Sequence, residues 1–146
     1  MKKLLILCLL LSGYSMAVGQ TGGNFAGDTD KAFGLIKNGA FKNGYNYVIT
    51  FANTSQAAIF VKPNTGYAIF FVYDNSKHPA TDFKVLLMTP DSALQKKYTA
   101  KPFDRAQVGV ARVQQLTFRT PQFTGETRPV KLQAKPNATM YVFDKK

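Results

Sequence analysis

The chain has 146 residues, of which 45% are hydrophobic and 18% charged, enough for one domain with an apolar core and too apolar for a largely disordered protein. Nineteen lysines and arginines face only 8 acids, so the net charge of +11 favours an anionic partner over a cationic one. A single cysteine and a single histidine exclude a disulfide framework and disfavour a metal site built from nitrogen and sulfur ligands.

The first 19 residues are typical of a signal peptide. Two lysines precede an apolar run at residues 4–11, which is too short to cross a bilayer as a helix. Small residues suit cleavage after Gly19, with cleavage after Ala17 as the alternative. We therefore expect an exported protein, periplasmic or secreted, with no transmembrane segment after cleavage. Acylation at Cys8 and an uncleaved anchor are the less favoured alternatives.

The next residues predict a flexible lead-in and then the start of the domain. Residues 20–30 are rich in Gly, Thr and Asn, and we assign residues 31–146 to a single domain. Residues 31–36 allow two interpretations. A preceding aspartate could cap a short helix that ends at Gly39, or the segment could be a first strand before the turn-prone pair Asn38-Gly39. The strand is the favoured interpretation.

The rest of the chain predicts seven or eight short strands separated by turn residues. Residues 45–51 alternate in polarity and are followed by a predicted turn at residues 53–55. Residues 66–74 are apolar on both sides, which predicts a central strand whose second side is covered by a loop, by a helix at residues 31–36 or by another molecule. The other strands are expected at residues 57–62, 83–88, 108–118, 130–134 and 139–143, with a further candidate near Tyr98 and a β-bulge at residues 112–115.

This regular spacing of strands and turns is typical of all-β proteins. We expect a two-sheet antiparallel β-sandwich of the jelly-roll or immunoglobulin-like kind, with a small β-barrel as the alternative. No internal repeat and no amphipathic helical segment of useful length is apparent in the sequence.

The sequence predicts no catalytic residue, no cofactor and no metal site, and therefore not an enzyme. His78 lies in a polar loop and could pair with Asp74 or Asp82 and a serine, but no Gly-x-Ser-x-Gly motif surrounds a candidate nucleophile. The eight carboxylates are scattered and mostly lie at turns, unlike the facing pair of a glycoside hydrolase. A small hydrolase that uses His78 is the least favoured function.

Two groups of residues are candidates for binding. Tyrosines of the first strands could line one face of a sheet and stack on sugar rings or on a protein partner, and basic residues of the second half could form a stripe for polyanions. The candidate ligand-binding residues are Tyr45, Tyr47, Tyr67, Tyr73, Lys96, Lys97, Lys101 and Arg105, and the stripe continues through Arg112, Arg119, Arg128, Lys131 and Lys135. The expected function is a non-catalytic module that binds an acidic glycan or a protein partner at the cell envelope. Nucleic acid is not expected as the partner of an exported protein. The alternative is a structural or assembly subunit of the envelope, which would form a homo-oligomer.

Overall fold

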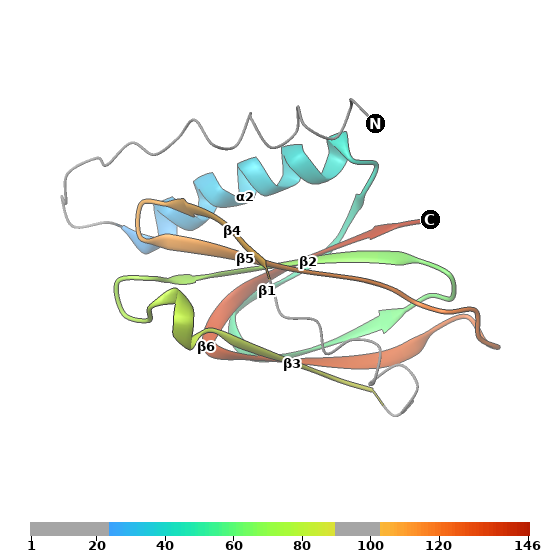
Figure 1. Ribbon diagram of the computed structural model, residues 1–146. Coiled ribbons are helices and arrows are strands. Elements are labelled where there is room, and N and C mark those ends of the chain that lie inside the picture. The colour runs from blue at the N-terminus through green and yellow to red at the C-terminus, as the bar shows by residue number, and fades with distance from the viewer. Residues whose placement is uncertain (1–23, 90–102) are drawn as a thin grey trace, which may run out of the picture.

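The computed structural model describes residues 24–89 and 103–146, and its strands form one bent antiparallel sheet with a helix on one side (Figure 1). The elements are α2 (Phe25–Lys42), β1 (Asn46–Val61), β2 (Gly66–Asp74), the 3-10 turn η1 (Ala80–Asp82), β3 (Lys84–Met88), β4 (Phe103–Val108), β5 (Ala111–Arg119) and β6 (Arg128–Lys145). Within these described residues, no helix has the length and apolar character needed to cross a bilayer. The predicted leader and the candidate strand near Tyr98 lie outside them.

The two long strands, β1 and β6, run through both halves of the bend. The first part of β1 pairs with the second part of β6, and the second part of β1, from Gln56 onward, pairs with the first part of β6. β2 then extends the sheet beside the second part of β6, whereas β3 pairs with the first part. The strand order is β1-β6-β2-β5-β4, with β3 off this path, and Figure 1 shows the β3 half folded under the β2 half.

The predicted turn at residues 53–55 is an irregularity inside one strand. Three register shifts interrupt β1 between Tyr47 and Gln56, and Asn53 has φ of 40°, a left-handed conformation that asparagine tolerates. The predicted strands at residues 45–51 and 57–62 therefore belong to one bent strand.

The prediction of a mostly β, antiparallel protein is confirmed, but a sandwich of two sheets is not. β1 and β6 pass continuously from one half to the other, so pairing joins all six strands into one sheet. The path from β1 to β4 has two ends, so the described strands do not close into the barrel named as the alternative.

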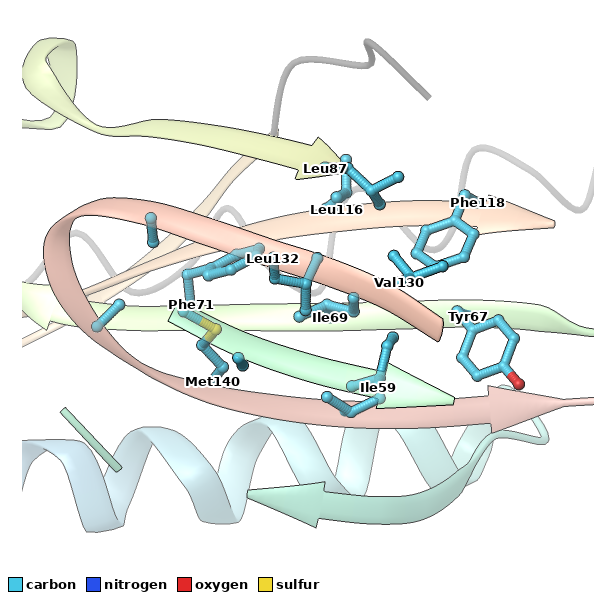
Figure 2. Packing of buried hydrophobic residues seen from close by; sticks show 14 of the residues in the cluster. Ile59, Tyr67, Ile69, Phe71, Leu87, Leu116, Phe118, Val130, Leu132 and Met140 are labelled. Atoms are coloured by element: carbon cyan, nitrogen blue, oxygen red, sulfur yellow. The ribbon is translucent and has the colours of Figure 1, made fainter. Parts of the chain in front are cut away.

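The concave side of the bend holds the larger hydrophobic core. Side chains from both halves meet there, and Figure 2 shows Ile69 and Phe71 of β2 facing Leu132 and Val130 of β6. All four are 0–1% exposed. The expectation that residues 66–74 form a central strand is confirmed, since β2 lies between β5 and β6.

Helix α2 covers the opposite face of the β2 half. Its buried residues Ala32, Ile36 and Ala40 recur every four residues and pack with Ala68 and Val72 of β2. The favoured strand at residues 31–36 is therefore wrong, and residues 25–30 of the predicted lead-in are helical as well. The sequence favoured a strand because glycines lower the intrinsic helix propensity of this segment. Packing against the sheet stabilises the helix instead. Helix α2 thus covers the second apolar side of β2, one of the three covers that the sequence predicted.

Helix α2 is tied to the turn between β4 and β5. The Asp28 carboxylate accepts a hydrogen bond of 3.0 Å from the backbone N–H of Val110. Gly109 beside it has φ of 57°, and a Cβ atom there would clash with the Asp28 carboxylate. The β-bulge predicted at residues 112–115 is not in β5, which pairs with β2 without a shift; the irregularity lies in β4, between Asp104 and Ala106.

Candidate functional site

Two of the four candidate tyrosines are core residues. Tyr67 is 2% exposed and Tyr73 is 0% exposed, and Tyr73 stacks on Phe83 with ring centroids 4.5 Å apart. The Tyr67 hydroxyl accepts a hydrogen bond of 2.8 Å from the backbone N–H of Lys62. Burial raises the pKa of both phenols. Neither ring is available to a ligand from solvent.

The other two tyrosines lie on the helix side of the sheet. Tyr47 is 44% exposed and makes edge contacts with Phe33 of α2 and Phe143 of β6. Tyr45 is partly buried, with the Lys145 ammonium 5.6 Å from its ring centroid.

The predicted row of four tyrosines on one face is therefore not formed. Phe143 of β6 pairs with Tyr47 of β1 on one side and with Ala68 of β2 on the other, so Tyr47 and Ala68 point to the same face of the sheet. Tyr67 is next to Ala68 in β2, and neighbouring residues of a strand point to opposite faces.

The basic candidates are only partly placed. Lys96, Lys97 and Lys101 lie outside the described residues. Arg105 of β4 donates a hydrogen bond from Nε to the side-chain oxygen of Gln115. In the same strand pair, Arg112 binds the Asp104 carboxylate and the Gln107 side chain. Both arginines thus have protein partners.

A different set of basic residues gathers on the outer surface of the bend. There the second part of β1, the first part of β6 and β3 form a three-stranded layer whose inner side faces the concave core. Its outer side carries three exposed lysines, Lys84, Lys131 and Lys135, which we call the lysine face. The basic stripe predicted from the sequence included Lys131 and Lys135. Lys84 joins them only because β3 pairs with β6.

The lysine face is electrostatically unbalanced. Lys84 is directly opposite Lys135 in the antiparallel register, and such like-charge pairs destabilise a sheet. None of the three lysines takes part in an ion pair within the described part of the chain. The other outward positions of the layer are uncharged: Gln56, Ala58, Phe60, Leu86, Met88, Pro129 and Gln133.

Apolar side chains lie among these charges. Phe60 is 69% exposed and Leu86 is 49% exposed, the former on β1 and the latter on β3. A surface that combines ammonium groups with exposed apolar side chains can hold a ligand that is both anionic and partly apolar.

His78 lies in an open groove of about 620 Å³ at the bend of the sheet. The lining includes both candidate aspartates, and its residues are Phe25, Asn53, Asp74, Lys77, His78, Asp82, Lys135, Pro136 and Asn137. The groove therefore brings His78 together with both candidate aspartates, but no serine is among the described residues that line it.

Among the side chains that the structure describes, contacts in this groove do not form a catalytic relay. The Asp74 carboxylate accepts hydrogen bonds from the backbone N–H and the hydroxyl of Ser76, at 3.0 and 2.5 Å, and pairs with Lys77 at 3.4 Å. Desolvation would raise the pKa of Asp74, but these contacts outweigh it and lower that pKa. Asp74 thus holds the loop after β2. Among the described residues, no hydrogen bond joins the imidazole of His78 to a serine or an aspartate.

Within residues 24–89 and 103–146, no three His, Cys, Asp or Glu side chains gather in a way that could hold a metal ion. The chain matches no protein-family model, no curated protein and no solved structure.

Proposed function

We propose that the protein is an exported, non-catalytic binding module that holds an acidic polysaccharide of the cell envelope against the lysine face. The single observation that supports this proposal is the pairing of Lys84 directly opposite Lys135, in a layer whose outward positions include no acid. A bound anion between the two ammonium groups would turn their repulsion into attraction.

The spacing of the lysines favours a polymer over a small ion. Lys131 and Lys135 are four residues apart on one strand, which corresponds to about 13 Å. A small anion in contact with one of these ammonium groups would lie about 10 Å from the other, beyond the Debye length of about 8 Å at physiological salt. A chain with repeated carboxylates or phosphates could contact all three lysines.

The exposed apolar residues favour a polysaccharide among such polymers. Phe60 offers an aromatic ring at the side of the layer, and Leu86 of β3 pairs with Gln133, which lies between Lys131 and Lys135 on β6. Sugar rings have apolar faces that can stack on such groups, while their acidic substituents bind the ammonium groups. The predicted signal peptide makes an envelope glycan accessible and nucleic acid an improbable partner.

Retention on an immobilised polyuronate, eluted with a salt gradient, tests the proposal. Replacing Lys84, Lys131 and Lys135 together by Gln should weaken binding about tenfold, because three exposed ionic contacts of roughly 0.5 kcal/mol each are lost. The matched control replaces Lys31, Lys37 and Lys42 of α2 by Gln, which removes the same charge from another surface. The control should elute close to the wild-type protein.

Two results would contradict the proposal. The wild-type protein could pass through the column at low salt without retention, or the two triple variants could elute equally early. The second result would indicate that net charge, and not the lysine face, governs binding.

A further inference from the structure

We infer that β1 pairs along its outer edge with β1 of a second copy of the chain. This inference goes beyond the proposed function and does not depend on it. Within the described residues β1 pairs only with β6, and it ends the strand order of the sheet. One side of β1 therefore presents backbone N–H and C=O groups that no other described strand satisfies.

The sequence of this edge lacks the usual protection against pairing. Exposed edges of monomeric proteins commonly carry charges, above all lysine, or proline. The sixteen residues of β1 contain no charged residue, no proline and no glycine, although the whole chain carries a net charge of +11. The edge is thus an uncharged strand in a strongly charged protein.

Irregularity protects only the first part of the edge. The three register shifts of β1 fall between Tyr47 and Gln56 and disrupt the straight line of backbone groups there. From Gln56 to Val61 the pairing with β6 is continuous. This six-residue segment, Gln-Ala-Ala-Ile-Phe-Val, is uncharged and ends in three residues that favour strands, a pattern that favours pairing between chains.

A second copy fits this edge better than an unrelated partner. An antiparallel pair of identical strands is self-complementary about a two-fold axis, so both edges are satisfied at once and the assembly closes as a dimer. No side chain of β1 would bring like charges together. The regular segment is short compared with standard interfaces, so we expect association that depends on protein concentration and not a permanent dimer.

The test combines sedimentation over a range of protein concentrations with hydrogen exchange of the backbone amides. The wild-type protein should shift from monomer to dimer as concentration rises, and amides of residues 56–61 should gain protection in parallel. Ala58→Lys places a charge on this edge without touching the core, since Ala58 is exposed. It should raise the dissociation constant about tenfold or more, because two like charges would approach one another across the two-fold axis.

Thr117→Lys is the matched control, because it adds the same charge at an exposed position of β5, which β6 and β2 separate from β1 in the strand order. It should dimerise like the wild-type protein. A strictly monomeric wild-type protein, an Ala58→Lys variant that dimerises normally, or equal loss of dimer in both variants would each overturn the inference. Protection gained in some other strand would do the same, because it would assign the interface to a different surface.

Discussion

The two halves of β6 lie in different environments although they belong to one strand. From Ala138 to Phe143 every residue is buried, because the concave core covers one side of the sheet and α2 the other. From Pro129 to Lys135 buried and more exposed residues alternate, because only the inner side is covered. The second half therefore contributes mainly to stability, and the first half presents a surface on which a partner can bind.

This difference predicts that substitutions in the two halves affect different properties. Changes in the doubly covered half should reduce the free energy of unfolding and leave binding intact wherever the chain still folds. Changes on the lysine face should reduce binding with little effect on stability. Each prediction below tests one side of this contrast, from the largest expected effect to the smallest.

Phe143→Ala should have the largest effect. Phe143 is 0% exposed and its ring contacts Phe41, Tyr47 and Phe70, so truncation removes buried apolar area and leaves a cavity between the sheet and α2. We expect a loss of about 3–5 kcal/mol in the free energy of unfolding, measured by chemical denaturation. Lys131→Ala, in the other half of the strand, should change it by less than about 0.5 kcal/mol. Similar losses for both variants would show that the two halves of β6 contribute equally to stability, against the prediction.

Ile36→Ala tests whether α2 is an integral part of the fold. Ile36 is 7% exposed and packs on the sheet, whereas its neighbour Leu35 is 63% exposed. Ile36→Ala should cost about 2–5 kcal/mol, and Leu35→Ala, which deletes a side chain of similar size, should cost less than about 0.5 kcal/mol. Thermal unfolding followed by circular dichroism would compare them. If Leu35→Ala proved the more damaging variant, the helix would dock through another face.

Most strands of this fold could be predicted from the sequence, because strand periodicity is local. The central position of β2 followed from its two apolar sides. The helix was only the less favoured interpretation of residues 31–36, because Gly34 and Gly39 weaken its local signal and the packing that stabilises it is not local. The bend at Asn53 looked like a turn, since asparagine suits turns and bulges equally well.

The candidate site was predictable only in part. Lys131 and Lys135 are four positions apart, an even interval, so their common face followed from the alternation of the strand. The position of Lys84 beside them depends on the pairing of β3 with β6, whose partners lie about fifty residues apart in the chain. Tyr67 and Tyr73 are in the core because a sequence pattern gives the side of a strand but not whether that side is inside.

The smallest expected effect is a decline of stability in alkali. Burial raises the pKa of Tyr67, Tyr73 and Tyr141 above 10, the value for an exposed phenol. The folded chain therefore keeps three protons that the unfolded chain releases above pH 10, so the free energy of unfolding falls as the pH rises further. Well below pH 10 these groups contribute no pH dependence, because both states hold the protons.

Tyr141→Phe should make this decline shallower without disturbing the packing, since the ring that stacks on Phe33 at 4.4 Å is kept. Denaturation at several pH values between 9 and 11, with phenolate absorbance of the folded protein as a second measurement, would show the change. Lysines also titrate in this range, but they do so in both proteins, so the difference between variant and wild type isolates the phenol. Equal slopes would mean that the Tyr141 hydroxyl reaches water, and hence that α2 does not seal this face of β6.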